Sequence, residues 1–84
     1  MQTELFRELD TLTATADSLF GVACNLYETP REEILATLEA LGRLTERTNA
    51  LEDAGIAVAY IRHMNNATRT VLTSFILNGW KTGK

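Results

Sequence analysis

Apolar and polar residues along the first third of the chain follow the spacing of an amphipathic helix. The apolar or small positions recur in steps of four and three, at Leu5, Leu9, Leu12, Ala16, Leu19, Ala23 and Leu26. Such a seam is typical of a helix that packs lengthwise against another helix. Large apolar residues beside the seam widen the stripe and favour a bundle with several neighbours. The pattern predicts a first helix over residues 2–27.

A proline segment predicts where the first helix gives way to the second. Thr29-Pro30-Arg31-Glu32 places a threonine at an N-cap, a proline at the first helical position and a glutamate at the third. We expect the Thr29 hydroxyl to accept a hydrogen bond from the backbone N–H near Glu32. Apolar positions then predict a second helix over residues 30–48. The short connection should make the first two helices antiparallel neighbours.

The helical pattern restarts near Asn49, where Asn49-Ala50-Leu51-Glu52 repeats a capping-box spacing. We therefore predict a third helix over residues 50–78, with the alternative that the second helix runs on to a cap at Gly55. Gly79 and Trp80 predict the end of the third helix, with Trp80 folded back on Phe75 and a tail over residues 79–84. The predicted fold is all-α: an antiparallel three-helix bundle, or a helical hairpin, in one domain over residues 1–84.

The segment Ala54–Ile61 is uncharged over eight consecutive residues. On a helix such a run covers every side, because each residue advances about 100°, and a helix that is apolar all round is buried all round. We therefore predict a homodimer or partner interface at Gly55, Ile56, Val58, Ala59 and Tyr60. The alternative is a central crossing inside a single bundle.

The chain is short and its charge is unevenly distributed. Its 84 residues are 45% hydrophobic and carry a net charge of −3, which fits one small globular domain. All 11 acidic residues lie within residues 1–53, whereas residues 54–84 carry two arginines, two lysines and no acid. Either the basic last segment packs against acidic helices, or it offers a basic face to an acidic partner.

Candidate chemistry is sparse. Cys24 is the only cysteine and His63 the only histidine, and they are predicted on different helices. Neither a zinc site nor a cysteine nucleophile with its base can be built from them. The glycines are isolated, so no phosphate-binding loop is evident. We expect no enzymatic activity, no catalytic or metal-binding residue and no cofactor.

A polar stripe marks the third helix, where Arg62, Asn66, Arg69 and Thr73 recur in steps of four, three and four. Arginine and asparagine are residue types that contact base edges in DNA, but two arginines are few for phosphate binding. Arg62, Asn66 and Arg69 are therefore candidate polar contacts to a partner, with a solvated face as the alternative.

These patterns together predict a small helical interaction protein that binds itself, another protein or both. The alternative is a small DNA-associated regulator that uses the third helix, although nucleic acid is the less favoured partner. The first residues lack the basic start of a secretory signal, and no stretch is apolar enough to span a bilayer. We expect a cytoplasmic protein without membrane contact.

Overall fold

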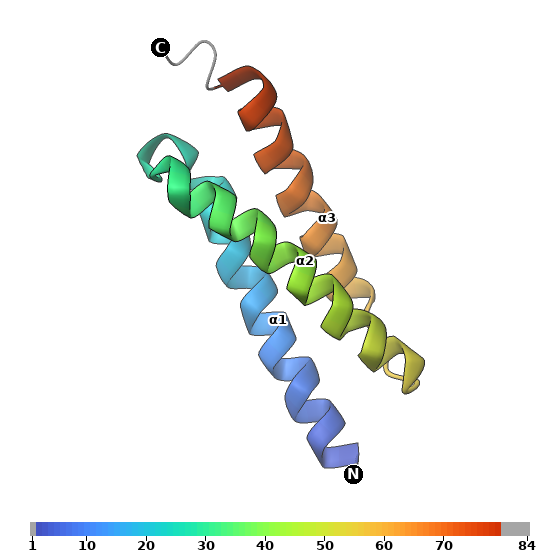
Figure 1. Cartoon of the computed structure of the whole chain (residues 1–84). Coiled ribbons are helices and arrows are strands. Elements are labelled where there is room, and N and C mark those ends of the chain that lie inside the picture. The colour runs from blue at the N-terminus through green and yellow to red at the C-terminus, as the bar shows by residue number, and fades with distance from the viewer. Residues whose placement is uncertain (1, 80–84) are drawn as a thin grey trace.

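The computed structural model describes residues 2–79, which form helices and short connections without a strand. The elements are α1 (Gln2–Cys24), the 3-10 helix η1 (Leu26–Glu28), α2 (Arg31–Asp53), α3 (Ala59–Ser74) and the π-helical turn η2 (Phe75–Gly79). In Figure 1, α1 runs upward, α2 returns downward and α3 runs upward again. The three helices pack against one another, so the predicted all-α antiparallel bundle is confirmed.

The core lies where the three helices overlap. Its buried apolar side chains are Leu12, Ala16, Ile34, Leu41, Leu44, Leu51, Val58, Ile61 and Leu72. The middle of the predicted first seam, at Leu12 and Ala16, is therefore its best-buried part. On α2 the buried stripe continues past Thr48 to Leu51 without a break in its spacing.

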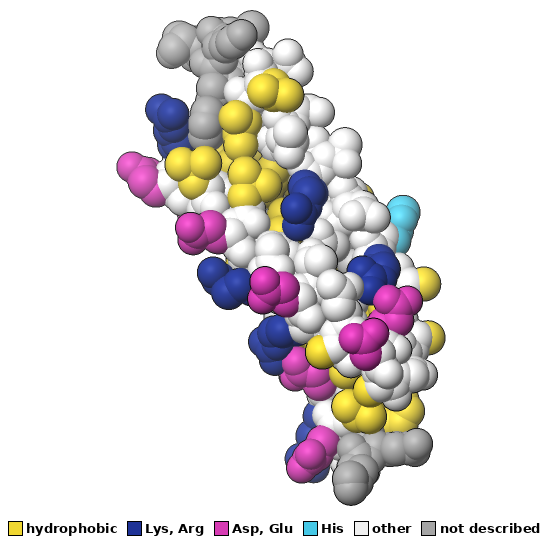
Figure 2. Space-filling view, turned by 45° about the vertical axis from the view of Figure 1, so that its right-hand side comes forward, with side chains coloured by type: hydrophobic (Ala, Val, Ile, Leu, Met, Phe, Trp, Pro, Cys, Tyr) yellow, Lys and Arg dark blue, Asp and Glu magenta, His cyan; other side chains and the backbone are white. Residues whose placement is uncertain are grey.

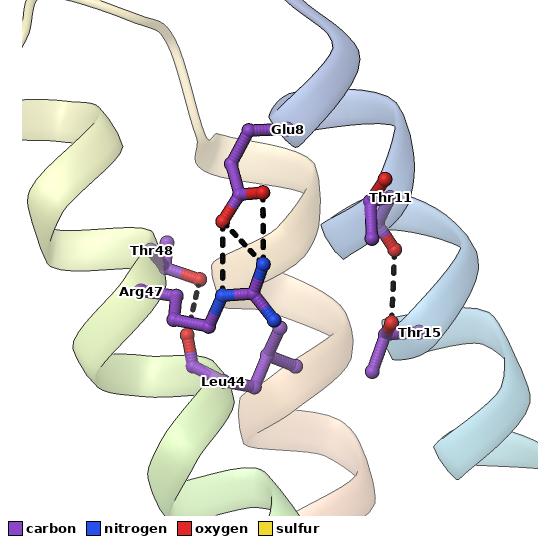
Figure 3. A network of polar contacts seen from close by, with 6 residues as sticks. All are labelled: Glu8, Thr11, Thr15, Leu44, Arg47 and Thr48. Carbon is purple, nitrogen blue, oxygen red and sulfur yellow. Dashed lines mark hydrogen bonds and ion pairs between the residues drawn. The ribbon is translucent and has the colours of Figure 1, made fainter. Parts of the chain in front are cut away.

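Three threonines complete this core. Thr37, Thr48 and Thr68 are at most 5% exposed. Each hydroxyl donates to the carbonyl oxygen four residues earlier, at 2.8, 2.7 and 2.8 Å respectively; Figure 3 shows this bond from Thr48 to Leu44. Because the helix itself satisfies the hydroxyl, threonine fills a core position much as valine would. Among the described residues, no buried side-chain nitrogen or oxygen lacks a hydrogen-bond partner.

The connection between α1 and α2 differs from the prediction. Helix α1 ends at Cys24 rather than at residue 27, and η1 follows it. The Thr29 hydroxyl donates to the Asn25 carbonyl at 2.6 Å instead of capping α2. Pro30 stands at the N-cap without a side-chain cap, and α2 begins at Arg31. The predicted capping box is wrong because α2 begins one residue later than expected, so that Pro30 and not Thr29 occupies the N-cap position.

The break predicted at Asn49 is also wrong, and α2 continues to Asp53 as in the alternative that ends at Gly55. Gly55 has a φ of +91°, which a glycine adopts without steric cost. The Ile56 N–H donates to the Leu51 carbonyl at 3.1 Å and the Gly55 N–H to the Glu52 carbonyl at 2.9 Å. These two bonds form a Schellman motif, and Ile56 packs against the core cluster that includes Leu51.

The apolar run at residues 54–61 is therefore a loop followed by the start of α3, not a helix apolar on every side. Helix α3 begins at Ala59 rather than at residue 50. Val58 is only 5% exposed and belongs to the core of the chain itself, and Ile56 packs against that core. The geometric premise of the predicted interface is thus incorrect, because loop residues do not cover a full turn of helix.

Helices α1 and α3 run in the same direction but are staggered. The Tyr60 hydroxyl, at the start of α3, donates to the Asp17 carboxylate at 2.7 Å. After Asp17 only seven residues of α1 remain, whereas nineteen residues of α3 and η2 follow Tyr60. The molecule is consequently elongated, 51 × 17 × 16 Å, and α3 extends beyond α1 at the upper end of Figure 1. Trp80, its predicted contact with Phe75 and the tail beyond lie outside the described residues.

Candidate functional site

The predicted polar stripe of α3 faces α2, and the two helices form a shared surface. On α2, residues in steps of four, three and four lie along the same side as the stripe. We define the α2–α3 face by Leu35, Glu39, Gly42 and Glu46 from α2 and by Arg62, Asn66, Arg69 and Thr73 from α3. The face contains an open groove of about 460 Å³ lined by residues of both helices, among them Gly42, Glu46 and Arg69. Figure 2 views this side and shows acidic and basic side chains along it, with hydrophobic ones gathered at its upper end.

Arg62 holds the lower part of this face together. Its guanidinium donates to the Asn49 side chain at 2.7 Å and forms an ion pair with Glu52. Both residues lie near the C-terminal end of α2. The only arginine–carboxylate pair between α2 and α3 in the described residues therefore partly neutralises one cation of the predicted stripe. This contact fits the interpretation in which the basic segment packs back against acidic helices.

Asn65 lies beneath the face and is not among the site residues predicted from the sequence. It is 5% exposed, and its amide donates to the Leu41 carbonyl at 3.2 Å and to the Thr45 hydroxyl at 3.0 Å. Arg69 in turn donates to the Asn65 side-chain oxygen at 3.4 Å. The signal for Asn65 in the sequence is its position four residues after Ile61, in the buried stripe of α3.

The α2 edge of the face is acidic, and its two glutamates have no ion-pair partner among the described residues. Glu39 and Glu46 are exposed, and neither forms an ion pair with another described residue. Gly42 stands between them in the middle of a long helix, where glycine costs about 1 kcal/mol relative to alanine. A Cβ at Gly42 would meet no atom within 4 Å. The packing of the single chain therefore does not account for this glycine.

A second surface lies at the upper end of the bundle, on the side toward α1. Tyr27, from η1, is 89% exposed and packs edge-to-face on Phe75 with ring centroids 5.5 Å apart. Val71, one turn before Phe75, is 38% exposed. We call Tyr27, Val71 and Phe75 the end cluster. Tyr27 and Val71 are exposed at this end of the bundle, where α1 has already ended, whereas Phe75 is half-buried and packs against the core.

The residues of the predicted interface differ in their exposure to solvent. Gly55 and Ala59 are exposed and Ile56 is half-buried, while Val58 points into the core. Tyr60 is 52% exposed, and its hydroxyl bonds to α1. The hydrogen bond to Asp17 is the main cause that raises the pKa of Tyr60 above 10.0, with burial and the Asp17 charge acting in the same direction. Tyr60 therefore serves as a contact between α1 and α3.

The candidate chemical groups stand apart. Cys24 and His63 are exposed on α1 and α3, and no hydrogen bond joins them among the described residues. Over residues 2–79, no three histidine, cysteine, aspartate or glutamate side chains are grouped so as to hold a metal ion. None of the described helices has an apolar stretch long enough to cross a membrane.

Comparison with known proteins identified no similar protein or family. No protein-family model matches the chain, and no match to it was found among curated proteins or solved structures.

Proposed function

We propose that this chain is a non-enzymatic interaction protein that binds another protein through a helical surface. The observation that supports it is the end cluster. Tyr27 is the most exposed large apolar side chain among the described residues, yet it packs on Phe75 in a defined geometry. Contiguous exposed apolar side chains are typical of protein-binding sites, and tyrosine and phenylalanine are enriched there.

The alternative, a DNA-associated regulator, is less well supported by the geometry. The guanidinium of Arg62 is already engaged by Glu52 and Asn49. Arg69 lies in a groove that Glu46 also lines. A phosphate backbone approaching these two arginines would meet carboxylates on the same face, whereas nucleic-acid sites concentrate positive charge.

Affinity capture with a matched pair of variants tests the proposal. The tagged chain is incubated with an extract of the cells that produce it, and bound proteins are identified by mass spectrometry. Tyr27→Lys combined with Val71→Lys should abolish the capture of a specific partner, since both changes place charge in the end cluster. Phe6→Lys is the control, because Phe6 is 51% exposed but lies at the other end of α1.

The result that contradicts the proposal is equally direct. If no protein is enriched over an unrelated bait, or if the double variant captures the same partner as the wild type, the end cluster is not a binding surface. Circular dichroism of each variant establishes that the helices are retained.

A further inference from the structure

The α2–α3 face carries opposite charges on its two sides, and this arrangement is independent of the end cluster. Glu39 and Glu46 stand on the α2 side, without ion pairs in the described part of the chain. Arg69 stands on the α3 side, where its nearest polar contacts are hydrogen bonds of 3.4 Å to Thr45 and Asn65. At that length the bonds are weak, so Arg69 retains capacity for a carboxylate partner.

The two helices that carry these charges are antiparallel neighbours, which makes the face complementary to itself. A two-fold axis that lies in the face, parallel to the helices, places α2 of one copy over α3 of the other. It also keeps each residue at its own height along the axis. The acidic edge of one copy then meets the basic edge of the other twice, as in an isologous dimer.

The heights of the charged groups match this arrangement. The Arg69 guanidinium lies level with Thr45, 3.4 Å from its hydroxyl, and Glu46 is the next residue on α2. Rotation about the axis therefore brings Arg69 of one copy opposite the partner's Glu46. At the upper end, Leu35 near the start of α2 and Leu77 near the end of α3 are 46% and 61% exposed. The same rotation brings these two apolar side chains together.

Space and area also suit a second copy. Gly42 lies at the centre of the α2 edge with open space where a Cβ would be, so a second helix can approach its backbone closely. The 21 residues of α3 and η2 extend about 30 Å along the face, and with the 17 Å width of the molecule they offer about 500 Å² per copy. That is close to the lower limit for a specific interface, about 1,000 Å² in total.

We propose that the α2–α3 face binds a second copy of this chain around a two-fold axis parallel to the helices. Arg69 of each copy pairs with the partner's Glu46, and the Gly42 segments allow the close approach. The resulting dimer leaves the end cluster of each copy open to a different protein.

Charge reversal tests the pairing in analytical ultracentrifugation. Arg69→Glu and Glu46→Arg should each weaken the dimer at least about tenfold, because each places like charges opposite one another. An equimolar mixture of the two variants should recover a dimer. In such a mixed dimer the Arg69→Glu copy is acidic at both positions 46 and 69, and the Glu46→Arg copy is basic at both, so each contact again joins opposite charges. Arg43→Glu is the control. Arg43 is exposed on α2 but lines a hollow toward α1, away from the α2–α3 face, so this variant should still form the dimer.

Gly42→Gln provides a test that loss of folding cannot imitate. Glutamine is a better helix former than glycine, and its Cβ would meet no other atom within 4 Å, so the monomer should melt at a higher temperature while the dimer is lost. Gly21→Gln, at a helical glycine with the same open surroundings on α1, should keep the dimer.

Three results would overturn the inference: a wild-type chain that stays monomeric at high concentration, a dimer that survives Gly42→Gln, or single charge reversals whose mixture does not restore association. A monomeric chain that still captures a partner through the end cluster would remove this inference and leave the proposed function intact.

Discussion

The buried amide of Asn65 allows the stability of the α2–α3 contact to be separated from its specificity. Replacing Asn65 with alanine removes the hydrogen bonds to the Leu41 carbonyl and the Thr45 hydroxyl. Each bond contributes about 1 kcal/mol, so we expect a loss of about 2 kcal/mol in the free energy of unfolding. In a domain of this size that loss lowers the melting temperature by about 8–16 °C.

Asn65→Leu should behave differently, although it removes the same two bonds. The Leu41 carbonyl also accepts a hydrogen bond from the Thr45 hydroxyl at 2.9 Å, so it keeps this side-chain donor when the Asn65 amide is removed. Leucine is similar in size to asparagine and adds buried apolar surface at a position that is 5% exposed. We expect Asn65→Leu to remain within about 1 kcal/mol of the wild type or to exceed it.

The assay is thermal unfolding followed by circular dichroism at several protein concentrations, so that dimerisation does not distort the comparison. If Asn65→Leu loses as much stability as Asn65→Ala, the two hydrogen bonds outweigh the apolar gain, contrary to this expectation. If it is as stable as the wild type, Asn65 contributes chiefly to the register of α3 on α2.

Three further predictions concern single side chains. Gly55→Ala should lower the free energy of unfolding by about 1–2 kcal/mol in thermal melts, because its φ of +91° disfavours a Cβ; an unchanged melting temperature would contradict the Schellman turn. Thr68→Val should raise the free energy of unfolding by up to about 1 kcal/mol in urea titrations, since it removes a hydroxyl from a position that is 0% exposed; a clear loss would show that its bond is needed. In a Tyr27→Phe background, Asp17→Asn should lower the pKa of Tyr60 in an absorbance titration, because Asp17 causes the upward shift. The folded pKa exceeds the unfolded one, so the contribution of this contact is present below pH 10 and is lost as the pH rises through the folded value.

The sequence predicted the bundle because the apolar spacing of its helices is regular. Leu12 and Ala16 lie in the seam at the steps expected for lengthwise packing, and both are buried. The end of α2 was harder to predict. Asn49-Ala50-Leu51-Glu52 has the residue types of a cap, but Leu51 also continues the buried stripe of α2, and core packing outweighs a local capping preference.

The site was predicted in part for a similar reason. The spacing of Arg62, Asn66 and Arg69 on one helix correctly placed them on one face. Their acidic counterparts on α2 could not be deduced, because the pairing of Arg62 with Glu52 depends on the register between two helices. The contact between Tyr27 and Phe75 could likewise not be deduced, since it depends on how far α3 extends past α1.

The stagger between α1 and α3 also divides the chain into regions of unequal protection. Only the middle of the bundle has three helices around it, and there Ala16 and Leu41 are almost completely buried. At the lower end, Glu8 on α1 and Arg47 on α2 form a bidentate contact at 2.8 and 2.9 Å near the molecular surface. Local opening is easiest where few apolar contacts must break. Amide hydrogens at both ends of the rod should therefore exchange with solvent well before those of the middle, so that each end can rearrange while the centre remains folded.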